Sequence, residues 1–420
     1  MTDDAESEHE TEPPLGRRIG EVALLFLRLG FTAFGGPAAH IAMIEDEVVR
    51  RRRWIDRQHF LDLIAAINFI PGPNSTELAI QLGYIRAGFA GLVVAGVCFI
   101  VPAVLIILPI AWAYVHYARL PQVQGMLLGV NAVVVAIVVN ACWRFAQSGV
   151  KNRFTAVVAA AGIVADAALQ RFPWMQPDLI VLAAAALAGI LWHARQHKAT
   201  RQNTAPLIVG PLLSRSTAPL AIAAPAAAGV AGLLQMAGFF LKVGATLFGS
   251  GYVLVSYLQS GVVDRYRWLT QQQLADAIAV GQFTPGPLLT TATFVGYLRG
   301  QQLFGDTGGA ILGAIVATAA IFAPSFVFVA LLGPFLPRVR RNPLARAAFD
   351  AMNAAVVALI AVVAVRLAAA LWSHHASANA LTLPLFLLTL VALLRWNLNA
   401  TWMILFGAAA GWLGSPLIRP

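Results

Sequence analysis

Continuous apolar runs, separated by short polar stretches, make up most of this chain. Many of them are long enough for a helix to cross the hydrocarbon core of a bilayer, which is ~30 Å thick and takes about 20 residues. Because the runs are continuous and do not alternate with polar positions, they predict helices and exclude the strands of a membrane barrel. We therefore expect an all-α polytopic membrane protein.

Two helix-breaking motifs interrupt the apolar sequence of the N-terminal half, FGGPAAH at 34–40 and NFIPGPNSTE at 68–77. The segments that flank them are each too short to cross a membrane alone: 19–34, 38–49, 56–70 and 74–88. They are either halves of broken spanning helices or arms of re-entrant hairpins. Arginines at both outer ends of each pair favour hairpins with both ends on the cytoplasmic side.

The chain contains an internal repeat, because residues 26–73 align without a gap to residues 240–287. FLRLGFTAFGGP matches FLKVGATLFGSG, and FIPGP matches FTPGP; 19 of the 48 positions are identical, which is too many for chance resemblance of apolar sequence. Both helix breaks therefore occur twice. A repeat of this kind marks two copies of one structural unit.

The repeat predicts four regions along the chain. These are an acidic, disordered cytoplasmic tail at 1–16, a first transport repeat at 17–195, a basic cytoplasmic linker at 196–216 and a second transport repeat at 217–420. We also expect an extra span near 217–234, which would turn the second repeat over relative to the first. Inverted-topology repeats with broken helices are typical of secondary transporters.

Charge supports this topology. The chain is 59% hydrophobic and only 11% charged, so its net charge of +10 indicates basic cytoplasmic loops and does not call for nucleic acid. The basic clusters at 50–53, in the linker and at 338–346 can all be cytoplasmic only if the second repeat is inverted. We expect a multi-pass protein of the cell inner (plasma) membrane with a cytoplasmic N-terminus.

The breaks themselves predict an anion site. A helix that restarts inside the membrane exposes unpaired N–H groups and a partly positive end, which suit an anion if the end faces a cavity. The alternative is that the breaks are packing kinks, but their recurrence in both halves favours a site. Arg28 and Lys242, which are repeat-equivalent intramembrane cations, would suit a doubly charged anion; the alternative is that each snorkels or pairs with a carboxylate such as Glu21.

The predicted substrate-binding residues are those of the breaks and the two cations. They are Arg28, Lys242, Thr32, Phe34, Gly35, Gly36, Pro71, Gly72, Pro73, Asn74, Ser75, Thr76, Thr246, Phe248, Gly249, Ser250, Pro285, Gly286, Pro287 and Thr290. Two further residues have no titratable counterpart in the second repeat, because Glu77 aligns with Thr291 and His40 aligns with Leu254. We assign both as candidates for ion coupling, with a counter-ion for Arg28 and a hydrogen-bonded core histidine as the alternatives.

Other polar residues in the apolar runs have structural interpretations. Asp62 and its counterpart Asp276 are expected to pair with arginines near the repeated tryptophans, and Asn131 and Asn353 to cross-link helices. The two cysteines fit no disulfide or metal pattern. No catalytic, metal-binding or cofactor motif is present, so we predict no enzyme activity and no cofactor.

The motifs FGGPAAHIAM, EDEVVRRRRWIDRQHF and PGPNSTELAIQLGYIRAG, with their second copies, resemble the chromate ion transporter family in its long, two-repeat form. This resemblance implies an inner-membrane carrier that exports chromate and confers resistance, with sulfate as a competitor. The short family form works in pairs, and a homodimer stays an open alternative here. Sulfate or another oxyanion as cargo, an anion channel with re-entrant pore loops, and a chromate-reducing enzyme are the competing hypotheses.

Overall fold

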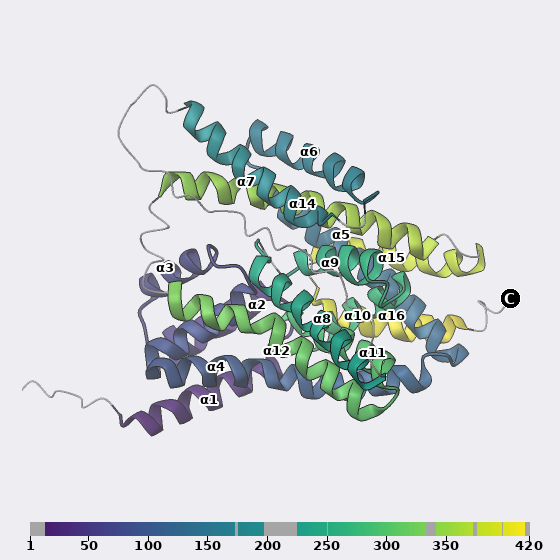
Figure 1. Cartoon of the computed structure of the whole chain (residues 1–420), viewed down its shortest axis with the longest axis horizontal. Helices are drawn as coiled ribbons and strands as arrows, with labels where there is room; N and C mark the ends of the chain where they lie inside the picture. Colours follow the sequence, from purple (N-terminus) through teal and green to yellow (C-terminus); the bar gives the residue numbers. More distant parts are fainter. Residues whose placement is uncertain are drawn as a thin grey trace, which may run out of the picture.

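The computed structural model describes residues 13–172, 175–196, 225–249, 251–332, 342–372, 376–396 and 398–415, and every regular element within these ranges is a helix (Figure 1). Seven of the described helices are long and apolar enough to cross a membrane. The prediction of an all-α polytopic membrane protein is therefore confirmed. Most of the expected tail and nearly all of the linker lie outside the described residues.

The first half contains eight described elements. They are α1 (Leu15–Thr32), α2 (Pro37–Glu45), the π-helix η1 (Asp46–Arg51), α3 (Arg57–Ile67), α4 (Asn74–Tyr117), α5 (Pro121–Gly149), α6 (Arg153–Leu169) and α7 (Pro177–Gln196). The chain leaves the helical conformation between α1 and α2 and again between α3 and α4. These interruptions fall at the GGP and PGP motifs, as the sequence predicts.

The second half repeats this order. It contains α8 (Pro225–Thr246), α9 (Val253–Leu258), the π-helix η2 (Gln259–Arg265), α10 (Gln271–Phe283), the 3₁₀-helix η3 (Leu288–Thr290), α11 (Thr291–Phe304), α12 (Thr307–Leu332), α14 (Pro343–Trp372), α15 (Ala376–Trp396) and α16 (Ala400–Gly414). A π-helix follows the first break in both halves. Arg53 and Arg267, which are equivalent in the repeat, both have a positive φ, of 50° and 53°, so the two copies share unusual backbone features.

The helix α4 consists of two segments that fold back on each other at Ala87 and Gly88, where the backbone is not helical. A Cβ on Gly83 would overlap the carbonyl oxygen of Gly91, so the segments touch through their glycines. The connection between α11 and α12 has the same form, with Gly296 against the carbonyl of Gly313. Each PGP motif is therefore followed by a short helix and then by a long apolar one.

The outer ends of the first-half segments lie together. Glu21 of α1 pairs with Arg86 at the end of the first α4 segment at 2.7 Å, and Arg86 lies over the ring of Trp54, which precedes α3. The start of α1, the end of the first α4 segment and the stretch before α3 therefore lie together. Tyr114, near the far end of α4, contacts Asp276 in the middle of α10, so a second-half helix packs at that end of α4.

The long helices exchange partners between the halves. The helix α5 packs against α15 and α16, whereas its second-half counterpart α14 packs against α6 and α7. The main core cluster of buried apolar side chains runs through these helices. Each half therefore contributes the helices against which the long helix of the other half packs.

The prediction of an extra span at 217–234 is wrong for the described part of that range. Residues 225–234 belong to α8, a single helix that continues to Thr246 and takes the position equivalent to α1. Its apolar sequence contains no break near residue 235, because Gln235, Met236 and Ala237 all favour a helix. Residues 217–224 lie outside the described residues.

Candidate functional site

Two backbone hydrogen bonds join the breaks of the two halves. The N–H of Gly72 donates to the carbonyl of Leu247 at 2.7 Å, and the N–H of Gly286 donates to the carbonyl of Ala33 at 3.0 Å. Gly72 and Gly286 are equivalent in the repeat, as are Ala33 and Leu247. The PGP motif of each half is therefore held against the first break of the other half, and the breaks of both halves contribute to one central region.

Glycine is required at these positions because the backbone has positive φ angles, which strain any other L residue. The angles belong to Gly35 (105°), Gly36 (82°), Gly72 (144°), Gly249 (91°) and Gly286 (94°). Ser250 lies outside the described residues. In the first half, the helix α2 then restarts with Pro37 in its first turn, where the missing N–H leaves no hydrogen bond unmade.

The two kinds of break differ in exposure. Both PGP motifs, Pro71 to Pro73 and Pro285 to Pro287, are buried. In the first break of the first half, by contrast, Phe34 is 37% exposed and Gly35 is also exposed. Phe248, the counterpart of Phe34, is half-buried and packs on the ring of Phe349. The break at GGP is thus the accessible helix end in this conformation.

His40 connects the two breaks of the first half. Its Nε2 lies 2.9 Å from the carbonyl oxygen of Ala33 and its Nδ1 lies 3.4 Å from the hydroxyl of Ser75. The ring is buried and stands edge-on to Phe99. His40 is therefore positioned as a bridge between the GGP and PGP motifs.

The hydroxyls predicted to face a ligand are mostly engaged with the backbone. Thr32 and Thr246 donate to the carbonyls one turn earlier, both at 2.8 Å, and Thr290 donates to Pro287 at 2.7 Å. Asn74 donates to the side chain of Asn68 at 2.6 Å. Thr76 differs, since its buried hydroxyl has no hydrogen-bond partner among the described residues.

Arg28 belongs to a cluster of guanidinium groups around one carboxylate. Its Nη1 lies 3.4 Å from Oε1 of Glu47, and Arg51 and Arg52 contact the same carboxylate at 3.2 and 3.3 Å. The alternative partner Glu21 binds Arg86 instead. Three cations on one anion leave a net positive charge, and the Arg28 side chain is 60% exposed. Its head group points to η1 and away from the breaks.

Lys242 has different surroundings from its counterpart Arg28. Its Nζ donates to Oε1 of Gln176 at 3.1 Å and lies over the ring of Phe239. Gly261 replaces Glu47 in this half, and a Cβ there would overlap the Phe239 ring. The aromatic ring therefore fills the place that a carboxylate occupies in the first half.

Asp178 stands close to Lys242 and was missed at the level of sequence. Its buried carboxylate accepts hydrogen bonds from the hydroxyls of Ser256 and Ser260. It shares a small cavity with Gln176 and Lys242. A carboxylate directly after Pro177 at the start of an apolar run could have been recognised, because charges inside spans are rare and default to functional sites.

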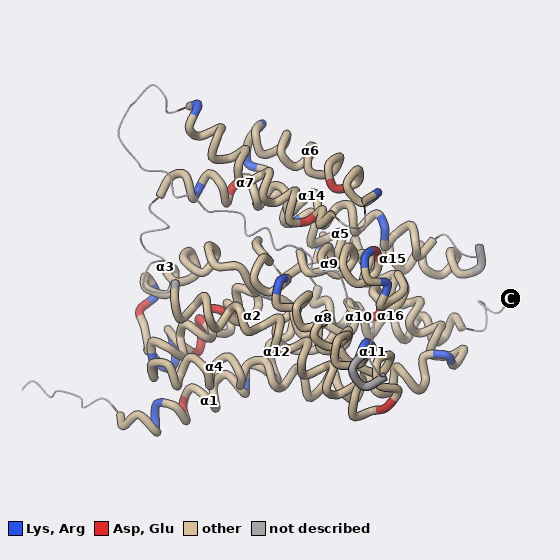
Figure 2. The backbone as a smooth tube through the Cα atoms, in the orientation of Figure 1, with Lys and Arg blue, Asp and Glu red and all other residues tan. Residues whose placement is uncertain are grey.

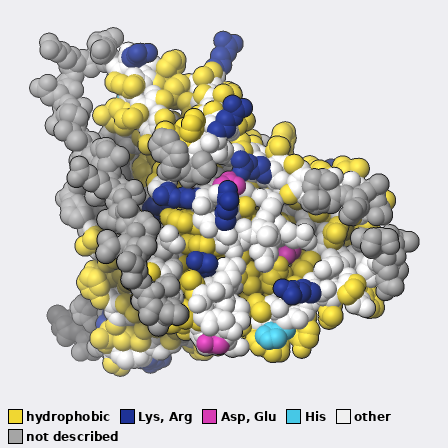
Figure 3. Space-filling view, turned by 45° about the vertical axis from the view of Figure 1, so that its right-hand side comes forward, with side chains coloured by type: hydrophobic (Ala, Val, Ile, Leu, Met, Phe, Trp, Pro, Cys, Tyr) yellow, Lys and Arg dark blue, Asp and Glu magenta, His cyan; other side chains and the backbone are white. Residues whose placement is uncertain are grey.

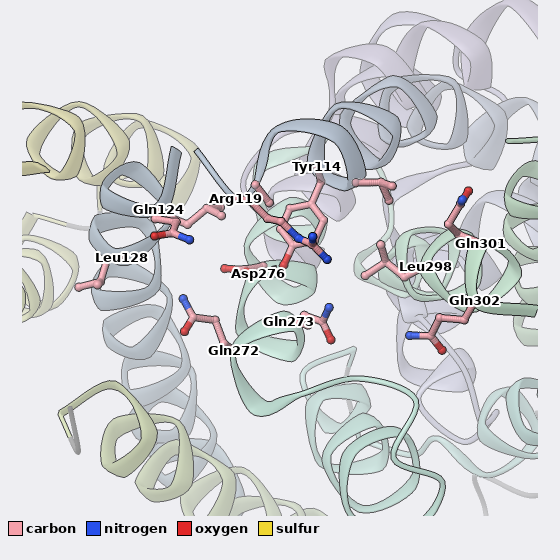
Figure 4. Close-up of a pocket in the computed structure, with 13 residues that line it drawn as sticks. Tyr114, Arg119, Gln124, Leu128, Gln272, Gln273, Asp276, Leu298, Gln301 and Gln302 are labelled. Carbon is pink, nitrogen blue, oxygen red and sulfur yellow. Dashed lines mark hydrogen bonds between the residues drawn. The ribbon is translucent and has the colours of Figure 1, made fainter. Parts of the chain in front are cut away.

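An open cavity of about 610 Å³ lies where α10, α11 and the end of α4 meet (Figure 4). Asp276 forms part of its wall, and this buried carboxylate accepts hydrogen bonds from the Tyr114 hydroxyl at 2.7 Å and from Nδ2 of Asn131 at 2.9 Å. In Figure 4 the side chains of Arg119 and Tyr114 lie over Asp276. The cavity is lined by residues of both halves, many of them polar.

These contacts correct one prediction and agree with another. Asp276 binds a phenol and an amide, whereas we expected an arginine near Trp268. Arg299 stacks on Trp268 at 5.4 Å, as Arg86 stacks on Trp54, but among the described residues no carboxylate forms an ion pair with Arg299, whereas Glu21 pairs with Arg86. Asn131 does link two helices, α5 and α10.

Charged residues gather around α1, α2 and α3 at one end of the molecule and near α10 and α11 at the other (Figure 2). Figure 3 shows the latter end partly turned forward, with Lys and Arg side chains among uncharged polar surface and apolar side chains around them. Basic groups therefore stand at both ends of the helix bundle, while others, such as Lys242 of α8 and Arg366 of α14, lie within apolar helices.

Comparison with known proteins places these features in context. A family model described as chromate transporter matches residues 20–190 and 234–412. A chromate transport protein of Cupriavidus metallidurans is 31% identical over 413 residues, covering 96% of this chain and 94% of the relative. A chromate transport protein of Pseudomonas aeruginosa is 31% identical over 396 residues, covering 93% and 91%.

A probable chromate transport protein of Synechococcus elongatus is 30% identical over 388 residues, which cover 91% of each chain. No solved structure matches this chain. The matched ranges of the family model contain both copies of the GGP-type and PGP breaks. The relatives therefore share the part of the molecule in which the two halves meet.

Proposed function

The chain belongs to the chromate transporter family, and on that premise we propose that it is a secondary transporter that carries chromate out of the cytoplasm. The observation that carries this proposal is the pair of hydrogen bonds that hold the breaks of the two halves together, Gly72 to Leu247 and Gly286 to Ala33. A site made by both halves is what a carrier needs, because movement of one half against the other changes which side can reach the site.

Chromate is a tetrahedral dianion with four oxygen acceptors. The restarted helices at the breaks present N–H groups and a positive dipole end, which stabilise such a ligand without a cofactor. The GGP break, with Phe34 and Gly35 accessible, is the end that an anion reaches in this conformation. Because these groups recognise charge and shape, sulfate fits the same site and should compete.

The cations act at a distance from the breaks. Arg28 lies in a cluster with net positive charge at the outer end of the first hairpins, and Lys242 lies beside Gln176 in the second half. Positive groups along a route raise the local concentration of anions and their rate of association. We assign Arg28 and Lys242 to the anion path, one in each half.

Alternating access between inverted repeats is the mechanism that we assign. Support comes from α4, which has first-half hairpin ends near its Arg86 and the second-half residue Asp276 near its Tyr114. Hairpins that open to opposite sides give the two states of a carrier by symmetry. With the Arg-rich end cytoplasmic, the inside-negative potential favours anion exit by ~2.3 kcal/mol per charge per 100 mV.

Chromate uptake by inside-out membrane vesicles that contain the protein tests this function. Export in the cell corresponds to uptake by such vesicles, and we expect it to saturate with chromate, to fall with excess sulfate and to respond to an imposed potential. Vesicles without the protein are the control. Uptake equal to that control would contradict chromate as cargo, and uptake that rises linearly with concentration would indicate a channel.

A further inference from the structure

Glu77 is a buried carboxylate without a partner. It is fully buried in the first α4 segment, and neither of its carboxylate oxygens has a hydrogen-bond partner among the described residues. No described cation forms an ion pair with it. The carboxylate lies against Gly72, where a Cβ would overlap it. The Glu77 carboxylate is therefore in contact with Gly72, the residue whose N–H makes the hydrogen bond to Leu247.

The polar groups around Glu77 are also unsatisfied. Ser325 of α12 reaches the same place, because its Oγ is 2.6 Å from the position of a Cβ on Gly72. Gln81 lies one turn after Glu77 on the same helix face. Among the described residues, the Ser325 hydroxyl and the Gln81 amide oxygen are both buried without a partner. Oxygen atoms dominate this cluster.

Charged and titratable groups nearby are directed elsewhere. His40 reaches the same helix, but its two ring nitrogens contact Ser75 and the carbonyl of Ala33 and not Glu77. On the other elements packed against α4, the charged groups have partners of their own: Arg28 pairs with Glu47, Glu21 with Arg86 and Arg57 with Glu45. Asp56 caps α3, Asp276 binds Tyr114 and Asn131, and Arg299 stacks on Trp268. The remaining titratable residues of these elements are Arg17, Arg18, His59, Asp62 and Tyr297. The described part of α12 has no titratable side chain.

The second half lacks this arrangement. A Cβ on Gly286 would meet the methyl group of Ala103, where Gly72 meets the hydroxyl of Ser325. Thr291, the counterpart of Glu77, donates to the carbonyl of Leu288 at 2.8 Å. Among the described residues the oxygen cluster therefore occurs in the first repeat alone, and the 3₁₀-helix η3 follows the second PGP motif where α4 begins directly after the first.

We propose that Glu77, Ser325 and Gln81 form a binding site for one small coupling cation, H⁺ or Na⁺. An ionised carboxylate buried without a partner is strongly unfavourable, and the partial charge of about +0.5 at the helix N-terminus offsets only part of it. A proton or a hard cation supplies the missing charge, and oxygen atoms are the ligands that such cations take.

The coupling role rests on the proposed function. Glu77 contacts Gly72 of the PGP break, so an ionised Glu77 would repel a dianion that binds at the breaks. A cation bound at Glu77 removes this repulsion and therefore favours binding of the dianion. By linkage, the anion favours the cation to the same degree. Occupancy of the cation site then sets whether the anion binds.

Thermal unfolding of the purified full-length protein tests the cation site without transport. A Na⁺ site predicts a higher melting temperature in sodium chloride than in choline chloride, and a loss of this difference in both Glu77→Gln and Ser325→Ala. A proton site predicts a higher melting temperature in acidic than in alkaline buffer, and a smaller difference in Glu77→Gln alone. Thr291→Val is the matched control and should respond as the wild type does.

Exchange of labelled chromate in proteoliposomes tests the coupling. In the wild type, we expect the chromate exchange rate to be about tenfold higher at saturating than at minimal cation concentration. In Glu77→Gln, we expect the exchange rate to be the same at both cation concentrations. Labelled sulfate is measured in parallel because it remains a dianion in both buffers. Equal cation responses of Glu77→Gln and the wild type, in melting or in exchange, would overturn the site. Without any wild-type exchange the proposed function fails, while the melting data still decide the cation site.

Discussion

Gly72 and Leu247 are joined by a backbone hydrogen bond of 2.7 Å across the boundary between the two halves. Gly286 and Ala33 make the symmetry-equivalent bond. Each half therefore supplies one donor and one acceptor, and neither half completes its own break. The PGP motif of each half therefore depends on the first break of the other half for this hydrogen bond.

Gly72→Ala should destabilise the protein more than a glycine substitution elsewhere. The φ of 144° strains any L residue, and the new Cβ would overlap the Glu77 carboxylate; such strain is worth about 1–3 kcal/mol before the overlap is added. Thermal unfolding measures the effect. Gly88→Ala, which has a φ of 60° and nothing within 4 Å, isolates the backbone strain. Equal losses in the two variants would contradict the contact with Glu77.

Arg28→Gln should weaken transport without unfolding the protein. The substitution removes one of the three cations on Glu47 and lowers the positive charge at the first hairpins. We expect the chromate concentration for half-maximal uptake to rise about tenfold, or ~1.4 kcal/mol. Arg57→Gln is the control, since this arginine is exposed and pairs with Glu45 in the same hairpin region. An equal rise of the half-maximal chromate concentration in Arg57→Gln would show that the effect comes from general surface charge and not from Arg28 itself.

Lys242→Gln tests the cation of the second half. The amide keeps a hydrogen bond to Gln176 but removes the charge, so transport should fall about tenfold or more while the protein stays in the membrane. Lys151→Gln removes an exposed lysine that pairs with Asp350 and should have little effect. Vesicle uptake and the amount of protein per vesicle are measured together. Wild-type uptake by Lys242→Gln would remove this lysine from the anion path.

Tyr114 and Asp276 should show a coupling energy in a double-mutant cycle. The phenol donates to the buried carboxylate at 2.7 Å, and a bond of this kind is worth about 1–3 kcal/mol when one partner is charged. Tyr114→Phe, Asp276→Asn and the double variant are compared by thermal unfolding. Additive effects of the two single substitutions would show that the bond between α4 and α10 contributes nothing to stability.

Local sequence signals predicted much of the fold and the breaks. Apolar runs, helix breakers and the repeat of residues 26–73 placed the helices and both pairs of interruptions, because these features depend on neighbouring residues. The extra span at 217–234 was wrong, since continuous apolar sequence does not reveal where one helix ends and another begins. The helix α8 runs through the expected boundary.

Partners of polar side chains were harder to predict. Asp276 binds Tyr114, which is 162 residues away, and Arg28 binds Glu47, although Glu21 is closer in sequence. The oxygen cluster at Glu77 needs Ser325 from the other half. The contacts of Asp276 and Ser325 form only when the two halves meet, and the pair of Arg28 and Glu47 forms only when η1 packs beside α1, so no local pattern specifies them.

Accessibility of the GGP break most directly tests the claim that a dianion binds where the helices are interrupted. A cysteine replaces Phe34 in a protein without its two native cysteines, and a membrane-impermeant thiol reagent labels it in vesicles. Ser148→Cys, an exposed polar position at the end of α5, is the control. We predict that sulfate, and not chloride, slows labelling at position 34 about threefold or more, as a ligand present at a few times its Kd would, and leaves position 148 unchanged. Labelling of Phe34→Cys at the same rate with and without sulfate would contradict this account.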